Sequence, residues 1–320
     1  MKLQQLRYVA EIAKQGNHLS AAAEALNTSQ PGVSRQIQVL EGELGVDIFR
    51  RTRNRIIGLT EPGEHVLAIA KRVTADVATL RSLKMDLEAL DQGQMVIATT
   101  HTQARYVLPN IVASFIKRYP KVELILKQGD PETICAMVED GEADFSVGPE
   151  TQRNFPELLR LQGNEIHRIV VGPSGHSIFS EPELTYENLA AHPLIAYDTR
   201  YSGRWKVMEA FQRAGCTPRF ALSAIDADVS KTYALLDLGL AILTNVAYNP
   251  AQDIGLEARD ASHLFPPSTT TITLRPTSYI RPYVLEFISS LSENLSLRAV
   301  RSALKSAIAR DCDRRWTGPR

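Results

Sequence analysis

The stretch that most constrains the fold is SAAAEALNTSQPGVSRQIQVLEGEL, at residues 20–44. It predicts two helices joined by a tight polar turn at Asn27 and Thr28. Ser20 is a candidate cap for the first helix and Ser29 for the second, because a serine hydroxyl can accept from a free N–H in the first turn. Pro31 fits that first turn, where its missing N–H has little cost. The stretch is therefore expected to form a helical hairpin.

The second helix of this hairpin has two contrasting faces. One face carries apolar side chains at helical spacing, namely Val33, Ile37, Leu40 and Leu44, and Gly45 follows as a natural stop. The other face is polar and of low bulk, as a helix in a DNA major groove must be. A surface hairpin with a solvated polar face shows the same pattern, so both interpretations remain open here. The candidate DNA-contacting residues are Gln30, Pro31, Ser34, Arg35 and Gln38.

The residues after Gly45 favour DNA binding. An apolar segment at 46–49 and another at 56–60 flank a basic run, which predicts a two-stranded ribbon with a cationic tip. Such a tip can contact phosphates beside a recognition helix. A further amphipathic helix at 3–13 precedes the hairpin. Together these elements predict a winged helix-turn-helix that binds double-stranded DNA. The candidate phosphate contacts are Arg50, Arg51, Arg53 and Arg55.

The distribution of charge along the chain supports DNA binding more than the net charge does. The net charge of the 320 residues is zero, but residues 1–60 hold eight Lys and Arg against five Asp and Glu. A small basic head on a neutral body is typical of a DNA reader with a separate module, although an ordinary solvated cluster is the alternative. The three cysteines are far apart and form no metal-binding spacing. With no signal sequence and no run of 18 apolar residues, we expect a cytoplasmic protein without membrane contact.

A long helix is predicted from residue 60 to 90. Thr60 is its expected cap, with Glu61 and Pro62 in the first turn. Apolar residues repeat along it with a period of seven, which is typical of a dimerising seam; packing against the same chain is the alternative. One row of the seam holds Val66, Val73, Leu80 and Leu87, and the other holds Ile69, Leu83 and Leu90, interrupted by Asp76.

From residue 91 the pattern changes to alternating strands and helices, which predicts an α/β domain with parallel sheets. We expect two lobes with a ligand cleft between them. Lobe I comprises residues 95–164 and 266–295, and lobe II comprises residues 165–265. The basic tail at 296–320 has an apolar stripe as far as Ile308 and is expected to dock as a terminal helix. A second DNA contact is the alternative for this tail.

The turn after the first strand of lobe I is a candidate anion site. Thr99, Thr100, Thr102 and Gln103 lie where the strand is predicted to enter a helix, so hydroxyls and free N–H groups would converge at the positive end of a helix dipole. They could hold an oxyanion without a full charge partner. Helix capping by Thr100 or Thr102 is the simpler alternative. No nucleophile-elbow, HExxH, P-loop or GxGxxG motif is present, which disfavours an enzyme, and His101 is interpreted as structural or ligand-adjacent.

At the head, the segment AAAEALNTSQPGVSRQIQVLEGELGVDIFRR and the later LTEPG resemble the LysR-type transcriptional regulators. The resemblance covers nearly the whole chain and implies residues 1–59 as the DNA-binding domain, 60–90 as the dimerisation helix and 91–320 as a two-lobed effector domain similar to periplasmic binding proteins. It implies no cofactor. An enzyme or a transport receptor on the same two-lobed fold is the competing class.

Further segments resemble the CysB/Cbl subgroup of that family. These are MKLQQLRYV, ATTHTQARYVLPN, IKRYPKVEL, GEADFSV, RAGCTPRF and DADVSKTY. The subgroup controls cysteine biosynthesis and sulfur-source use. The resemblance implies a homodimer assembled into a homotetramer, RNA polymerase as a candidate partner, and an effector such as sulfate, O- or N-acetylserine, or adenylylsulfate.

The resemblance also assigns the effector site. Thr100, Thr102 and Gln103 coincide with ligand-contacting positions of the subgroup, and Ser202 stands where the subgroup has threonine, so a hydroxyl is kept. Pro149 replaces a further threonine, and Ile166 aligns with a tryptophan. These two departures remove a hydroxyl donor and an indole donor, and are expected to change which ligand fits.

Overall fold

The computed structural model describes residues 1–53, 55–88, 91–199, 202–276 and 280–316. The chain forms two compact units, with the main boundary after residue 89.

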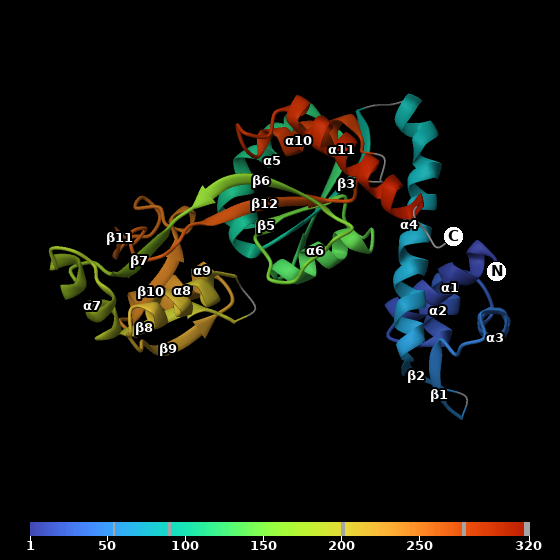
Figure 1. The fold of residues 1–320 in the computed structure, drawn as a ribbon, viewed down its shortest axis with the longest axis horizontal. Coiled ribbons are helices and arrows are strands. Elements are labelled where there is room, and N and C mark those ends of the chain that lie inside the picture. The colour runs from blue at the N-terminus through green and yellow to red at the C-terminus, as the bar shows by residue number, and fades with distance from the viewer. Residues whose placement is uncertain (54, 89–90, 200–201, 277–279, 317–320) are drawn as a thin grey trace. The chain divides into compact units, whose positions relative to one another are not determined.

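The first unit is a winged helix-turn-helix followed by a long helix (Figure 1). Three helices precede the wing, and the wing is a two-stranded antiparallel sheet in which Phe49 pairs with Leu59. The predicted hairpin, ribbon and long helix are all confirmed. The elements are α1 (Leu3–Lys14), α2 (Leu19–Ala25), α3 (Gln30–Leu44), β1 (Phe49–Thr52), β2 (Arg55–Leu59) and α4 (Glu61–Glu88).

The helix boundaries follow local capping chemistry. The Ser29 hydroxyl accepts from the backbone N–H of Gly32, and Gly45 ends α3 in the left-handed conformation with φ 69°, as predicted. The prediction that Ser20 caps the first helix is wrong. Helix α2 begins at Leu19 with His18 at the cap position and no side-chain capping bond, because the chain turns into the helix one residue earlier.

The core of this unit lies where α1, α2 and α3 meet. Val33, Ile37 and Leu40 of α3 are fully buried, which confirms the predicted apolar face. Leu44, predicted on the same face, is 40% exposed. The last turn of α3 therefore projects beyond the core.

Helix α4 begins at the base of the wing. The Thr60 hydroxyl accepts from the N–H of Gly63 at 2.9 Å, which confirms the predicted cap. Val66 and Val73 are partly buried against the core of the first unit, where α4 packs on α1. These first two residues of the predicted heptad row therefore make contacts within the same chain. Ile69 and Leu80 are exposed. The side chains of Leu83 and Leu87, and all of Leu90, lie outside the described residues.

Lobe I of the second unit is built on one five-stranded sheet, in the order β4-β3-β5-β12-β6. Strands β4 and β5 both pair in parallel with β3, whereas β12 is antiparallel to β5 and β6. The elements are β3 (Gln92–Thr99), η1 (Gln103–Val107), α5 (Leu108–Arg118), β4 (Lys121–Gln128), α6 (Pro131–Glu139), β5 (Phe145–Pro149), β6 (Leu159–Ile166), β12 (Ser268–Leu274), α10 (Pro282–Ser290) and α11 (Leu297–Trp316).

Lobe II repeats this plan, in the order β11-β7-β10-β8-β9. Strands β8, β9 and β10 are parallel, and β7 is antiparallel to β10 and β11. Its elements are β7 (Arg168–Pro173), η2 (Ser177–Ser180), α7 (Tyr186–Ala190), β8 (Pro193–Tyr197), α8 (Ser202–Arg213), β9 (Arg219–Ala224), α9 (Ala227–Leu235), β10 (Leu240–Thr244), η3 (Asn245–Ala247) and β11 (Leu256–Asp260).

Two sequence predictions for this unit need correction. The sheets are mixed rather than parallel, because the strands that enter each lobe from the other run against the βαβ strands. Strands β6 and β11 were not predicted. β6 is polar on its exposed face and broken by Gly163, with the burial pattern of an edge strand, so it lacks a continuous apolar run.

The chain passes between the lobes twice. It leaves lobe I at the end of β6 and enters lobe II at Arg168, and it returns to lobe I at Ser268, the first residue of β12. Strands β6 and β12 lie side by side, with Ile166 paired to Ser268 (Figure 1). These two connections bring β7, β12 and the loops after β3 and β8 to one cleft.

The C-terminal tail docks on lobe I as α11. Val300, Leu304 and Ala307 are buried, whereas Ile308 is 42% exposed, so Ala307 takes the place predicted for Ile308. Every helix among the described residues is too short or too polar to span a lipid bilayer.

Candidate functional site

The polar face of α3 is accessible. Gln30, Pro31, Arg35 and Gln38 are exposed and Ser34 is half-buried, while the opposite face forms the core. Arg35 makes no ion pair with any described residue. The predicted contact residues therefore form one surface that could enter a major groove.

The four wing arginines do not have equal surroundings. Arg50, Arg53 and Arg55 are exposed, and Arg53 lies at the ribbon tip with φ 55°. The Arg51 guanidinium instead lies 2.8 Å from the Glu41 carboxylate. Arg51 thus joins the wing to α3, whereas the other three arginines present their charge to solvent.

Glu41 was not predicted as a site residue, yet it holds the wing in place. Its carboxylate is 6% exposed and accepts from the N–H of Ile48 at 2.9 Å and from the N–H of Phe49 at 3.2 Å. It also accepts from Arg51. These bonds satisfy buried backbone donors. The available sequence signal was a carboxylate on the inner side of α3, one position after Leu40.

In the second unit, a small cavity lies at the cleft between the lobes. Its volume is about 40 Å³. On the same measure one water molecule needs about 10–15 Å³, so the cavity has room for a compact group such as an oxyanion. We call it the Thr100 cavity. Its lining residues are Thr100, Thr102, Gln103, Pro149, Ile166, Arg168, Tyr197, Gly203, Thr244 and Ser268.

Five of the seven predicted effector residues line this cavity: Thr100, Thr102, Gln103, Pro149 and Ile166. Thr99 does not. Its hydroxyl donates to the carbonyl of Val147 at 2.8 Å and fixes β3 to β5. Ser202 begins α8 next to the lining residue Gly203, but its side chain lies outside the described residues.

The helical turn at this cavity has an unusual form. The N–H of Ala104 donates to the carbonyl of Thr100, so the first turn opens at Thr100 and leaves N–H groups there without helical partners. A π-helical segment follows at Gln103–Val107, and such segments often mark functional sites. The buried Gln103 amide donates to Thr270 Oγ1 at 3.4 Å, and its Oε1 has no partner among the described residues.

Five lining residues were not predicted from the sequence, namely Tyr197, Gly203, Thr244, Ser268 and Arg168. Of these, Arg168 carries a positive charge. It is 3% exposed, and its Nη2 donates to Ser268 Oγ at 3.2 Å. Burial lowers the pKa of Arg168, against the opposing effects of Tyr197 and Glu150. The structure therefore places a cation in the lining of the cavity, whereas the sequence predicted an anion site without a full charge partner. The available sequence signal was a single arginine directly before the buried run Ile169–Val171.

Tyr197 lines the same cavity and interacts with Thr102. Burial raises the pKa of the Tyr197 hydroxyl, while Thr102 and the Arg168 guanidinium partly oppose this rise. The phenol is thus neutral at ordinary pH and can donate a hydrogen bond. It adds a polar group to the cavity without adding charge.

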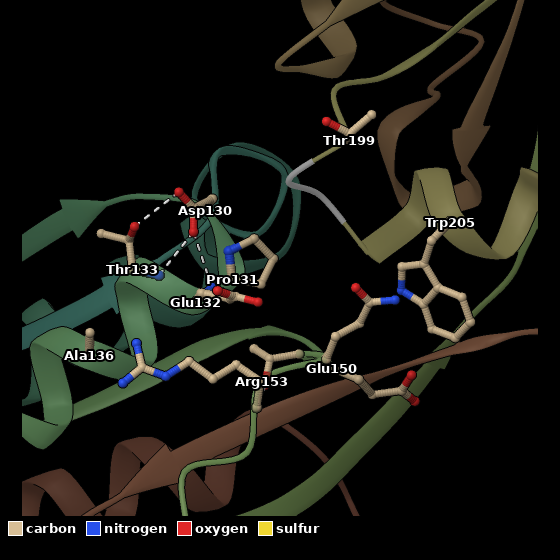
Figure 2. Close-up of a pocket in the computed structure, with 11 residues that line it drawn as sticks. Asp130, Pro131, Glu132, Thr133, Ala136, Glu150, Arg153, Thr199 and Trp205 are labelled. Carbon is tan, nitrogen blue, oxygen red and sulfur yellow. Dashed lines mark hydrogen bonds between the residues drawn. The ribbon is translucent and has the colours of Figure 1, made fainter.

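A second, larger cavity has a volume of about 340 Å³ and is lined by residues at the start of α6, after β5, after β8 and on α8 (Figure 2). Trp205 and Glu150 approach it from α8 and from the end of β5. On the other side Asp130 accepts from the N–H groups of Glu132 and Thr133, at 3.1 and 2.9 Å, and so caps α6. We call this second cavity the Trp205 cavity.

A polar cluster around Asp228 joins the two lobes. The Tyr106 hydroxyl of η1 donates to Asp228 Oδ1 at 2.6 Å, and Arg105 and His101 lie 3.5 and 3.9 Å from Oδ2. Partial burial by itself would raise the pKa of Asp228, but the Tyr106 hydrogen bond and the neighbouring Lys231, Arg105 and His101 side chains outweigh it and hold that pKa below its ordinary value.

This cluster gives His101 a structural partner rather than a catalytic one. The described residues contain no group of three or more His, Cys, Asp and Glu side chains that could hold a metal ion. The Asp228 cluster links the two lobes through the Tyr106 hydrogen bond and the contacts of Arg105 and His101.

Comparison with family models accounts for both units. Residues 3–64 match a model described as bacterial regulatory helix-turn-helix protein, lysR family. Residues 88–296 match the LysR substrate binding domain.

Individual relatives are similar over nearly the full chain. The HTH-type transcriptional regulator SsuR of Burkholderia cenocepacia is 41% identical over 96% of this chain and 100% of its own. The regulator CysB of the same organism is 42% identical over 95% of this chain and 97% of its own. The solved cofactor-binding domain of the Cbl transcriptional regulator is 34% identical, with a TM-score of 0.63 over 67% of this chain and 93% of that chain.

Proposed function

Because this chain belongs to the LysR family of transcriptional regulators, we propose that it regulates genes of sulfur assimilation, cysteine biosynthesis or the use of sulfonates and sulfate esters. Its activity responds to a small anionic sulfur metabolite or an acetylserine bound between the lobes. The similarity to SsuR, CysB and Cbl supports the pathway. The observation that carries the proposal is the Thr100 cavity, where a buried cation and several donors meet.

DNA binding uses the surface of α3 and the wing. Gln30, Pro31, Ser34, Arg35 and Gln38 lie in the major groove, and Arg50, Arg53 and Arg55 contact flanking phosphates. Arg51 acts mainly through Glu41, because its guanidinium is already ion-paired. A change in the spacing of paired heads would then transmit the effector signal to the promoter.

Pairing of heads requires a dimer, and α4 offers a seam for it. Ile69 and Leu80 are exposed on this helix at apolar positions of the heptad pattern. In lobe II, Val229, Tyr233 and Leu236 form a second exposed apolar stripe on and just after α9. The two surfaces together support a homotetramer, in which one copy meets others through each surface.

The test is calorimetric titration of the full-length protein with sulfate, thiosulfate, O-acetylserine, N-acetylserine and adenylylsulfate. The same titrations use Thr102→Ala, which removes a cavity hydroxyl. We expect at least one compound to bind and the variant to bind it more weakly. The matched control is Thr232→Ala, since the Thr232 hydroxyl donates to its own helix at Asp228 O and lies outside the cavity lining.

DNA binding is measured in parallel on a promoter fragment carrying a pseudo-palindromic site. Thr102→Ala should keep basal DNA binding and lose the response to the effector. If no compound binds, the effector class is wrong, whereas the assignment of α3 as the DNA reader is unaffected. If Thr102→Ala abolishes DNA binding in a folded protein, the separation of reader and sensor is wrong.

Pro149 and Ile166 favour one alternative within the family. Both line the cavity, and neither supplies a hydrogen-bond donor from its side chain. A LysR-type regulator of another pathway with a retuned pocket is therefore the second candidate, and the same titrations test it.

A further inference from the structure

Arg168 is a buried cation without a carboxylate partner among the described residues. It begins β7, is 3% exposed, and donates through Nη2 to the neutral Ser268 hydroxyl at 3.2 Å. An ionised group removed from water is costly unless it is paired. A bound anion would supply the missing partner.

The nearest carboxylate does not fill this role. Glu150 accepts from Lys206 Nζ at 2.7 Å through one oxygen and from the N–H of Thr269 at 3.1 Å through the other. Lys206 is itself buried. Glu150 is therefore hydrogen-bonded to Lys206 and to the Thr269 backbone, and among the described residues Arg168 has no hydrogen-bonded carboxylate of its own.

The chain also leaves space for the guanidinium. A β-carbon on Gly203 would lie 2.9 Å from Arg168 Nη2 and 3.4 Å from Cζ. The glycine in the first turn of α8 thus permits the arginine to reach the cavity wall, a use of glycine for close approach. Gly203 of lobe II thus leaves room for the guanidinium, and Ser268 of lobe I accepts its hydrogen bond.

We propose that Arg168 recognises the negative charge of the effector, which therefore carries a sulfate, sulfonate or carboxylate group. This proposal rests on the proposed function and names the chemistry of its ligand. The oxyanion lies between the Arg168 guanidinium and the hydroxyls and N–H groups of the turn at Thr100–Thr102. Guanidinium and oxyanion geometry match for two parallel hydrogen bonds.

The test compares charged and neutral probes of similar shape. Full-length protein is titrated with sulfate, methanesulfonate and methanesulfonamide, using the wild type, Arg168→Met and Arg168→Lys. Charge-assisted hydrogen bonds predict a loss of at least about tenfold in affinity for the two anions in Arg168→Met. Arg168→Lys should lose less, and affinity for the neutral sulfonamide should be the same in all three proteins.

Arg204→Met is the matched control. Arg204 is an arginine of α8 whose guanidinium carbon lies 3.6 Å from the centre of the Phe220 ring, and it does not line the Thr100 cavity. Its replacement should leave anion affinity unchanged. Thermal unfolding and basal DNA binding verify that each variant is folded.

The outcomes separate the two proposals. The wild type could bind the anions while folded Arg168→Met binds them with an affinity within about threefold of the wild-type value. In that case Arg168 does not recognise the charge, and the proposed function stands. If the wild type binds neither these probes nor the metabolites above, both proposals fail. Should Arg168→Met not fold, Gly203→Ala displaces the guanidinium while keeping its charge, and unchanged anion affinity there would overturn the proposal. Stronger binding of sulfate than of methanesulfonate indicates an inorganic effector, and the reverse order indicates an organic one.

Discussion

The Cα of Gly63 lies against the carbonyl oxygen of Ile48, so closely that a β-carbon on Gly63 would be 1.9 Å from that oxygen. The same carbonyl accepts from the N–H of Thr60 at 3.0 Å. The N–H of Ile48 donates to Glu41. Ile48 therefore connects α3, the wing and the first turn of α4 through its backbone.

Gly63→Ala should destabilise the first unit. The new methyl group must move the Ile48 carbonyl, and overpacking of this kind costs about 1–3 kcal/mol. Thermal unfolding measures the loss. Gly42→Ala is the control, because nothing lies within 4 Å of its added β-carbon and alanine favours a helix. Equal unfolding temperatures for the two variants would contradict the close approach.

Glu41→Ala should loosen the wing. It leaves the N–H groups of Ile48 and Phe49 without their acceptor, at a cost of about 1–3 kcal/mol for each buried donor. Hydrogen exchange of these two amides should accelerate, together with a lower unfolding temperature. Glu43→Ala is the control on the same helix, since Glu43 is exposed. Unchanged exchange at residues 48 and 49 would show that another group holds the wing.

Arg35→Ala and Arg53→Ala should weaken DNA binding in different ways. Arg35 lies on the exposed face of α3, so its loss should cost about 1–3 kcal/mol and relax specificity. Arg53 lies at the wing tip, so its loss should weaken binding to all sequences and reduce the salt slope by about one unit. Fluorescence anisotropy at several salt concentrations measures both. Arg7→Ala, an exposed arginine of α1, is the control. Identical behaviour of Arg35→Ala and Arg7→Ala would exclude α3 as the reader.

Asp228→Asn should reduce stability in a pH-dependent manner. The folded pKa of Asp228 lies below its ordinary value of 3.8, so its ionised form stabilises the fold above that pH and this contribution is lost as the pH falls through the folded pKa. Asp228 is partly exposed, so we expect a difference of at most about 1 kcal/mol. Urea unfolding of the wild type and the variant at several pH values measures it. A difference that does not shrink below pH 3.8 would show that charge at Asp228 is not the cause.

Leu80→Glu should weaken self-association. Leu80 is 65% exposed on α4, and a carboxylate in a helix seam must be desolvated when the helices pair. Sedimentation velocity over a range of concentrations measures the change. Ile254→Glu is the control, because Ile254 is 82% exposed in the second unit. If both variants sediment as the wild type does, α4 does not form the dimer seam.

The first unit was predicted well because its structure is governed by near neighbours in the chain. The Ser29 cap, the stop at Gly45 and the apolar period of α3 each depend on residues within a few positions. Ser20 and Leu44 were mispredicted at the ends of helices, where one residue of shift changes which side chain caps or packs.

Local sequence patterns were enough to predict the helix-turn-helix, the wing, the long helix, the two α/β lobes and the turn at Thr100 where an anion could bind. The residues that complete this site are brought together by the fold. Arg168 and Ser268 are 100 positions apart, and Gly203 lies between them in sequence on a separate helix. Their convergence depends on two mixed sheets and two crossings between the lobes. Local patterns of polarity carry no information about contacts between residues so far apart in the sequence. The position of Arg168 at the cavity could therefore be seen only in the folded structure.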